Sequence, residues 1–331
     1  MEIGILGGGS WGTALAVMWA SAFERVDLWV RNADDARVMT ETRFPARYLR
    51  EIPLPANLHV TSDLASVVRR HRVLGLAIPL PAYRDFLNQF GRLFLDHDLI
   101  LLSKGIEVDS LLFPSQIVCD VLGASWESRT FALSGPSFAR EVAVHKPTTV
   151  VLTGPEGDRL LELREQLATP RFRLYSNPDI VGVELAGAMK NVIAIAAGIA
   201  QGMEFGSNTM AGLITRGLAE ISRLGEKMGG KRETFAGLAG MGDLILTCTG
   251  SQSRNLTVGI RLAEGLALPQ ILKELGMVAE GVKTTKAARQ LSAREGVELP
   301  ITEVVHGILY EGLTPRQGLA QLMTRSLKSE V

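Results

Sequence analysis

Several common features are scarce or missing in this 331-residue chain, and each absence excludes a class of protein. It contains only two cysteines, Cys119 and Cys248, which form neither a C-x-x-C motif nor a disulfide framework, so a reduced, cytoplasmic protein is expected. Formal net charge is zero, which gives no electrostatic reason to expect nucleic acid or an anionic membrane surface as a partner.

Signals for export and for membrane insertion are also lacking. The chain enters a strand-like run at once, without the basic segment that opens a secretory signal. Its longest apolar runs are interrupted by Gly, Lys or Asn before they reach a membrane span, so we expect no integral membrane association. At 46% apolar and 21% charged residues, the composition is that of a soluble globular protein long enough for two domains.

Metal-binding and hydrolase motifs are absent as well. The histidines show no H-x-x-x-H spacing, no carboxylate cluster accompanies them, and no G-x-S-x-G occurs. We therefore expect no metal and give little weight to a hydrolase. The histidines are His59, His71, His97, His145 and His306.

What the chain does have is a glycine-rich turn near its start. The apolar run 1–6 leads into G-G-G-S-W-G, and a helix-like run follows at 13–18. This is G-x-G-x-x-G between a strand and a helix, the setting in which it binds a dinucleotide. Gly7 would permit the tight turn, Gly9 would let a pyrophosphate approach the backbone, and Gly12 would let helix and strand pack closely. A glycine-rich turn without function is the alternative.

The end of the second strand bears on the choice of cofactor. Residues 26–30 are the second predicted strand, after which an NAD-preferring fold often places an acid against the ribose 2′-hydroxyl. Arg31 and Asn32 stand there instead. An arginine suits a 2′-phosphate, which favours NADPH without excluding NADH; stacking of Arg31 on adenine is the alternative.

Alternating patterns predict the fold class. Short apolar runs separated by helical segments argue for an α/β, Rossmann-like N-terminal domain with a mainly parallel sheet. The alternation stops near 176–179, after which the pattern is almost entirely helical, with Pro269 and Pro300 as helix-start signals. We therefore predict a dinucleotide-binding domain over 1–178 and an all-α domain for substrate binding and catalysis over 179–331. Beyond the first two strands, the predicted strands are 58–60, 73–78, 99–102, 130–133, 148–152 and 172–175.

A lysine and an asparagine interrupt a run, 183–198, that otherwise reads as a buried helix. On a helical repeat, Lys190 shares its face with small residues, which leaves room beside the ammonium group. A buried ammonium must find a counter-charge, bind an anion or lose its proton. The alternative is a lysine whose head reaches water from a partly exposed helix.

Three further segments carry candidate binding groups, each with a simpler alternative. Lys104 follows a predicted strand and is either a site residue or a solvated loop lysine. Ser137 opens a helix, as a ligand contact or as a plain N-cap. In the glycine-rich segment 237–255, Asp243 is either a site residue or an N-cap. Arg254 either binds a phosphate with its guanidinium group or is a surface arginine.

Six segments, in this order, resemble the bacterial NAD(P)-dependent glycerol-3-phosphate dehydrogenases, and together they span nearly the whole chain. They are GGGSWGTALA (7–16), SKGIE (103–107), SGPSFARE (134–141), VELAGAMKNVIAIAAGI (183–199), GSNTMAGLITRGLAE (206–220) and GLAGMGDLILTCTGSQSRN (237–255). The resemblance implies that dihydroxyacetone phosphate and sn-glycerol 3-phosphate are the substrate pair, that the reaction supplies phospholipid synthesis, and that the enzyme is a homodimer.

The resemblance also implies site residues, position by position. Lys190 matches the proton-transferring lysine of the family. Asn32 and Gly250 depart from the pattern, since many members carry His or Asp at the first position and Ser at the second. Substrate-contacting positions are Lys104, Gly135, Ser137, Asp243, Ser253, Arg254 and Asn255, and cofactor-contacting positions are Ser10, Trp11, Arg31, Asn32, Lys104, Ala139, Arg254, Val278 and Glu280.

These residues give a mechanism and two rivals to it. Hydride would pass from the nicotinamide to the ketone carbon while Lys190 delivers the proton, a role that requires a pKa below that of a free lysine. Asn191 and Thr247 would orient the reacting oxygen, and Arg254 would hold the phosphate. One rival is a related 3-hydroxyacid dehydrogenase; the other is a regulator that binds NADPH without catalysis.

Overall fold

The computed structural model describes residues 1–276 and 279–326, which fall into two compact units. Unit 1 comprises residues 1–104 and 112–184, and unit 2 comprises 105–111 and the chain from Leu185 onward. The short segment 105–111 therefore packs with the second unit although it lies within the sequence of the first.

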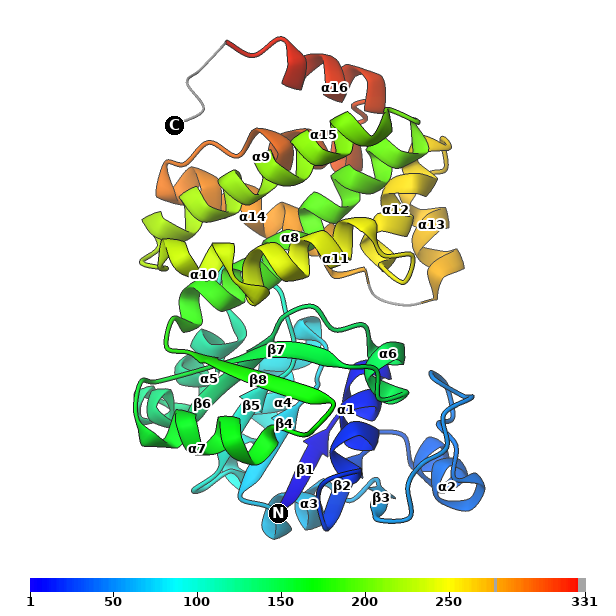
Figure 1. The fold of residues 1–331 in the computed structure, drawn as a ribbon, viewed down its shortest axis with the longest axis vertical. Helices are drawn as coiled ribbons and strands as arrows, with labels where there is room; N and C mark the ends of the chain where they lie inside the picture. Colours follow the sequence, from blue (N-terminus) through cyan, green and yellow to red (C-terminus); the bar gives the residue numbers. More distant parts are fainter. Residues whose placement is uncertain (277–278, 327–331) are drawn as a thin grey trace. The chain divides into compact units, whose positions relative to one another are not determined.

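Unit 1 is built on one eight-stranded sheet of order β3-β2-β1-β4-β5-β6-β7-β8 (Figure 1). Every neighbouring pair is parallel except β6 with β7, so the predicted mainly parallel sheet is confirmed. The strands run over β1 (Glu2–Leu6), β2 (Arg25–Trp29), β3 (Leu58–Thr61), β4 (Val73–Leu76), β5 (Asp98–Leu101), β6 (Thr130–Ser134), β7 (Thr148–Thr153) and β8 (Phe172–Asn177).

Both faces of the sheet are covered, as the apolar character of its strands requires. Along β5 and the residue that follows it, Leu99 and Leu101 belong to one buried apolar cluster, while Ile100 and Leu102 belong to another. Successive side chains of a strand point to opposite faces, so each cluster fills one face. The covering α-helices are α1 (Ser10–Ala20), α2 (Ala33–Thr42), α3 (Leu64–Arg70), α4 (Tyr83–Phe90), α5 (Pro114–Leu122), α6 (Ala139–Ala143) and α7 (Asp158–Leu167).

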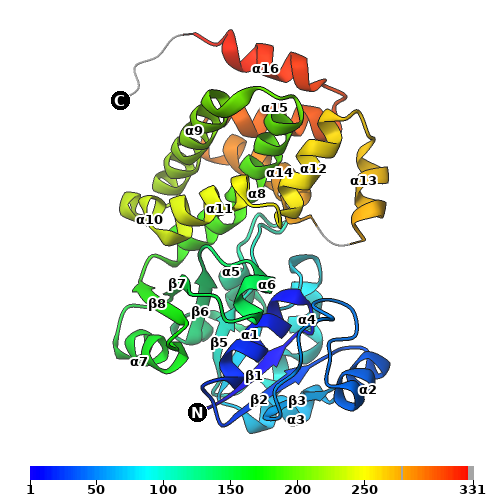
Figure 2. The same cartoon turned by 45° about the vertical axis from the view of Figure 1, so that its right-hand side comes forward.

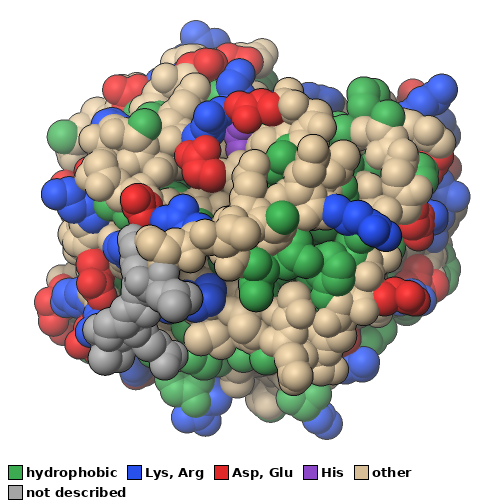
Figure 3. Space-filling view, turned by 90° about the horizontal axis from the view of Figure 1, so that it is seen from above, with side chains coloured by type: hydrophobic (Ala, Val, Ile, Leu, Met, Phe, Trp, Pro, Cys, Tyr) green, Lys and Arg blue, Asp and Glu red, His purple; other side chains and the backbone are tan. Residues whose placement is uncertain are grey.

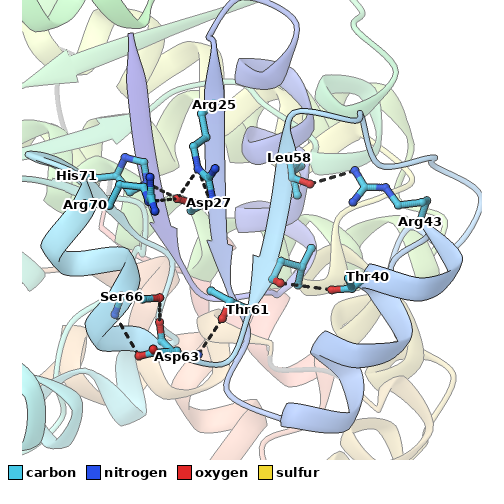
Figure 4. A network of polar contacts seen from close by, with 11 residues as sticks. Arg25, Asp27, Thr40, Arg43, Leu58, Thr61, Asp63, Ser66, Arg70 and His71 are labelled. Carbon is cyan, nitrogen blue, oxygen red and sulfur yellow. Dashed lines mark hydrogen bonds and ion pairs between the residues drawn. The ribbon is translucent and has the colours of Figure 1, made fainter.

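The buried Asp27 of β2 is surrounded by three basic side chains (Figure 4). The Asp27 carboxylate lies 2.6 Å from His71 Nε2 and 2.9 Å from an Arg25 guanidinium nitrogen, with Arg70 Nε at 3.5 Å. Burial alone would raise the pKa of Asp27, but the hydrogen bonds from His71 and Arg25 and their charges outweigh it and lower the pKa to about 2. The acid is therefore ionised and compensated inside the sheet.

All regular secondary structure in the described residues of unit 2 is helical, which confirms the predicted all-α region (Figures 1 and 2). Pro300 opens α15 and Pro269 lies in the first turn of α13, as predicted. The helices are α8 (Ile180–Gly202, whose first residues belong to unit 1), α9 (Gly206–Lys227), α10 (Arg232–Ala236), α11 (Asp243–Thr249), α12 (Arg254–Ala263), α13 (Leu268–Leu275), α14 (Glu280–Glu295), α15 (Pro300–Tyr310) and α16 (Pro315–Met323).

Glycines set how closely α12 crosses α8. A Cβ at Gly198 would lie 2.1 Å from Leu256 O, and one at Gly259 would lie 2.1 Å from Ile195 O. Both distances are far below van der Waals contact, so only glycine permits this crossing. It brings the start of α12 against the part of α8 that carries Lys190.

By length and composition alone, α8 could cross a membrane, contrary to the expectation that every apolar run is too short. However, 89% of its most apolar window is buried inside the structure, as in the core helix of a folded domain. On the face drawn in Figure 3, acidic and basic side chains are interspersed around one hydrophobic patch. Such mixing agrees with the balanced charge of the chain.

Candidate active site

The glycine-rich turn between β1 and α1 has the geometry of a dinucleotide loop. Gly7 has φ +126°, and a Cβ there would lie 2.5 Å from Ala77 O. A Cβ at Gly12 would lie 2.1 Å from Gly7 O, so glycine is required for α1 to start this close to the strand. At Gly9, by contrast, an added Cβ meets nothing within 4 Å. The open space lies where a pyrophosphate would approach the first turn of α1.

Asn32 and Arg31 follow β2 in different roles. Asn32 is the N-cap of α2, where its Oδ1 accepts the Asp35 N–H at 2.9 Å. Arg31 is exposed, and no ion pair within the described ranges includes it. Its guanidinium therefore stays available to an anion at this edge of the sheet.

Two loops follow β5 and β6 in unit 1. Lys104 is half-buried just beyond the end of β5. After β6, Gly135 has φ +127° and its carbonyl accepts the Ser137 hydroxyl at 2.9 Å. The N-cap of α6 is Phe138, so the N-cap role considered for Ser137 is wrong: the helix starts one residue later than that role requires. Ala139 is the first residue of α6.

Lys190 forms a buried ion pair in unit 2. Its Nζ lies 2.5 Å from Asp243 Oδ1; Lys190 is 9% exposed and Asp243 1%. A lysine that reaches bulk water is therefore excluded, and the counter-charge that burial demands is Asp243.

Asp243 begins α11 directly after a π-helical turn over Leu238–Gly242. Its carboxylate is used by Lys190 and the N-cap is Gly242, so the N-cap role considered for Asp243 is wrong. One turn later, Thr247 Oγ1 donates to Asp243 O at 2.6 Å. The same hydroxyl lies 3.4 Å from Asp243 Oδ1, the oxygen that pairs with Lys190.

The start of α12 supplies three more of the predicted residues. Ser253 is the N-cap, its Oγ accepting the Leu256 N–H at 3.2 Å. Asn255 is buried and its Nδ2 donates to Asn191 Oδ1 at 2.9 Å. Arg254 is half-buried, and none of the ion pairs found over 1–276 and 279–326 involves it.

The predicted residues thus gather in two groups, one in each unit. Unit 2 brings Lys190, Asn191, Asp243, Thr247 and Asn255 together, with Ser253 and Arg254 beside them on α12. Glu280 is the first residue of α14, and Val278 lies outside the described residues. Residues 7–12, 31, 32, 104, 135, 137 and 139 lie in unit 1. Within the described residues, no group of three or more metal-ligating side chains comes together.

Fold and site are those of a nicotinamide-dependent oxidoreductase with a Rossmann-like region and a helical region. Residues 2–158 match the family model for the NAD-dependent glycerol-3-phosphate dehydrogenase N-terminus, and residues 179–320 match the model for its C-terminus. The chain belongs to this family, which confirms the resemblance seen in the sequence.

Individual relatives are similar over their full length. The chain is 48% identical to "Glycerol-3-phosphate dehydrogenase [NAD(P)+]" of Nitratidesulfovibrio vulgaris over 100% of both chains. It is 47% identical to the protein of the same name from Syntrophobacter fumaroxidans, over 99% of this chain and 97% of that one. The crystal structure of glycerol-3-phosphate dehydrogenase from Coxiella burnetii superposes with a TM-score of 0.92 at 38% identity, covering 98% of this chain and 99% of that one.

Proposed function

We propose that the protein reduces dihydroxyacetone phosphate to sn-glycerol 3-phosphate with NAD(P)H, in keeping with relatives that are named glycerol-3-phosphate dehydrogenase [NAD(P)+]. The observation that carries the proposal is the buried Lys190–Asp243 pair, close to a half-buried arginine that has no acidic partner in the described ranges. A proton donor and a phosphate-binding group are what this reduction needs beyond the cofactor. The product supplies glycerophospholipid synthesis.

Lys190 is the proposed acid in reduction and base in oxidation. When bound, NAD(P)H supplies the hydride to the ketone carbon. Lys190 Nζ donates a proton to the oxygen as negative charge develops on it, and Asp243 keeps the ammonium in place until then. Asn191 orients that oxygen with a hydrogen bond from its Nδ2 group, and Thr247 takes part by turning its hydroxyl hydrogen from Asp243 O to the substrate.

Arg254 is the residue proposed to bind the phosphate group of the substrate. Its planar fork of donors matches phosphate oxygens, and Ser253 and Asn255 flank it in sequence. Binding energy gathered at the phosphate fixes the distance from the ketone to Lys190. Further proposed substrate contacts, carried over by motif position, are Lys104, Gly135 and Ser137.

Preference for NADPH over NADH is a separate proposal, supported by the exposed Arg31 and the absence of an acid at 30–32. Replacing Arg31 with Ala is expected to raise the KM for NADPH and leave that for NADH nearly unchanged; an equal rise for both would contradict it. The proposed cofactor contacts are Gly7, Gly9, Ser10, Trp11, Gly12, Arg31, Asn32, Lys104, Ala139, Arg254, Val278 and Glu280.

Three wider proposals come with this function. Residues 1–178 would bind the cofactor and 179–331 would hold the substrate and the acid. The enzyme would be a homodimer acting in the cytoplasm. Sedimentation of the purified protein tests the dimer directly, with a single species of monomer mass as the contrary result.

The reaction is tested by following reduced-nicotinamide absorbance with NADPH or NADH, on addition of dihydroxyacetone phosphate or unphosphorylated dihydroxyacetone. Fast oxidation with the phosphate ester alone is expected. Arg254→Gln should lose most of this discrimination, and Lys190→Ala should lose turnover while still binding NADPH. Turnover only with 3-hydroxyacids or their ketones would favour the hydroxyacid dehydrogenase, and NADPH binding without any turnover would favour a regulator.

A further inference from the structure

A chain of hydrogen bonds joins three helices of unit 2 beside the lysine. The backbone N–H of Gly281, in the first turn of α14, donates to Asn255 Oδ1 on α12 at 3.0 Å. Asn255 Nδ2 in turn donates to Asn191 Oδ1 on α8 at 2.9 Å. Asn191 is 4% exposed and Asn255 7%, so little water competes for these groups.

The chain has a fixed direction because it starts at a backbone amide. A backbone N–H can only donate, whereas a side-chain amide can be turned to present either oxygen or nitrogen. Gly281 therefore fixes which end of Asn255 is the acceptor, and Asn255 then fixes Asn191 in the same sense. With its Oδ1 turned toward Asn255, the Asn191 amide presents its Nδ2 group on the opposite side.

That remaining group is a donor next to Lys190. One Nδ2–H of Asn191 makes a long bond of 3.5 Å to Gly187 O, within its own helix, which leaves the other for a ligand. A reacting oxygen that gains negative charge needs donors, and an acceptor turned toward it would repel it. In the observed orientation, Asn191 would donate to the reacting oxygen and favour the reduction. In the opposite orientation, its own oxygen would face that atom and disfavour the reduction.

Glycine is the residue that allows the first bond of the chain. A Cβ at position 281 would lie 2.6 Å from Asn191 O and 2.7 Å from Asn255 Oδ1. One of these atoms is backbone of α8, so the added methyl would push α14 away from both partners. The N–H bond to Asn255 would then be lost.

We propose that Gly281 is a positioning residue of the reductase site: its backbone N–H orients the Asn255–Asn191 pair so that Asn191 presents a hydrogen-bond donor beside Lys190. Gly281 itself contacts neither substrate nor reacting atoms in this proposal. The inference rests on the proposed function, since it assigns the donor to the oxygen of the ketone being reduced.

Asn255→Asp tests the direction of the chain with a side chain of the same shape. A protonated carboxyl reproduces the amide: its C=O accepts from Gly281 and its O–H donates to Asn191. An ionised carboxylate has only acceptors, so Asn191 must turn and present its oxygen to the substrate. We expect the ratio of kcat for variant to wild type to fall about tenfold per pH unit above the pKa of the introduced group.

This ratio is measured with dihydroxyacetone phosphate between pH 5.5 and 8.5. Lys190, Asp243, Arg254 and Glu280 are charged groups on the helices that meet here and are the same in both proteins, so the ratio isolates the introduced carboxyl. A ratio that is the same at every pH would overturn the proposal, because a loss of packing alone does not titrate in this way.

A second pair of variants tests the glycine. Gly281→Ala should lower kcat about 10²-fold, the usual effect of losing one donor to a developing oxyanion. Gly212→Ala, a matched change in α9 where a Cβ meets nothing within 4 Å, should leave kcat unchanged. Thermal unfolding reports whether each variant is folded. A folded Gly281→Ala protein with kcat within about twofold of wild type would contradict the proposal, whereas a wild type without turnover of this substrate would refute the proposed function instead.

Discussion

Glu184 offers a quantitative test of how burial and hydrogen bonding combine in unit 1. This residue in the first turns of α8 is 7% exposed, and its carboxylate accepts the Ser115 N–H at 3.0 Å and the Ser115 hydroxyl. Ser115 is the second residue of α5, after Pro114, so the carboxylate satisfies the N-terminus of that helix. Burial raises the pKa of Glu184 to about 7, against the lowering effect of the two bonds from Ser115.

The sign of the effect on stability follows from this shift. The pKa rises from its ordinary value of 4.5 to about 7 on folding, so the folded state holds the proton more tightly. The stability that this group contributes is fully present below pH 4.5 and is lost as pH rises through 7. At about 1.4 kcal/mol per pKa unit, the loss amounts to about 3 kcal/mol.

Glu184→Gln removes the titration and keeps the shape. We expect the stability of the variant relative to wild type, measured as the difference in free energy of unfolding, to be about 3 kcal/mol higher at pH 8 than at pH 4.5. Urea unfolding followed by circular dichroism at several pH values measures this difference. Glu156→Gln is the control, since Glu156 is exposed in the same unit and should show no such trend. Parallel pH curves for wild type and Glu184→Gln would refute the reasoning.

Three further perturbations test other buried polar groups. Asp27→Asn should lower the free energy of unfolding by about 2 kcal/mol at pH 7. Folding lowers the pKa of Asp27 from 3.8 to about 2, so the stability that the carboxylate contributes is present above pH 3.8 and is lost as pH falls through 2. The difference between variant and wild type in urea unfolding should therefore vanish near pH 2. Tyr83→Phe should stabilise by about 1 kcal/mol, since the buried phenol oxygen has no hydrogen-bond partner among the described residues; a lower melting temperature would contradict this. Asp243→Asn should cost about 3 kcal/mol by removing one partner of the buried Lys190–Asp243 ion pair, and adding Lys190→Met should recover most of it. Additive losses in thermal unfolding would show that the two residues do not interact.

Local patterns were enough to predict most of the fold. The predicted strand 148–152 corresponds to β7 and 172–175 to β8. Both could be predicted because the pattern that distinguishes a short buried strand from a helix is visible within a few consecutive residues. The glycine turn at 7–12 was equally local, since strand, turn and helix follow one another directly. Among site residues, Lys190 stood out because a charge in an apolar helix is costly wherever that helix packs.

Contacts between distant segments could not be predicted in this way. Asn191 and Asn255 were each identified, but their pairing across 64 residues was not. The hydrogen bond that Glu184 accepts from the start of α5 was not predicted either. The same holds for Glu220, whose carboxylate accepts the Ile301 N–H at 2.6 Å. In the sequence these two residues cannot be told from any other glutamate of a helix. Only the packing shows that each carboxylate accepts a backbone N–H at the start of another helix.

Helix caps show the same limit, and they bear on ligand binding. Ser137 and Asp243 were considered as N-caps and are not, while Asn32 and Ser253 are, because the choice depends on where a helix begins to within one residue. A cap commits the side-chain oxygen to a backbone N–H. Capping points the side-chain oxygens of Asn32 and Ser253 at the backbone, and the amide N–H groups of Asn32 and the hydroxyl hydrogen of Ser253 remain as donors. If these residues bind as proposed, they would therefore do so as donors to phosphate or ribose oxygens, in the same way that Gly281 is proposed to orient Asn255.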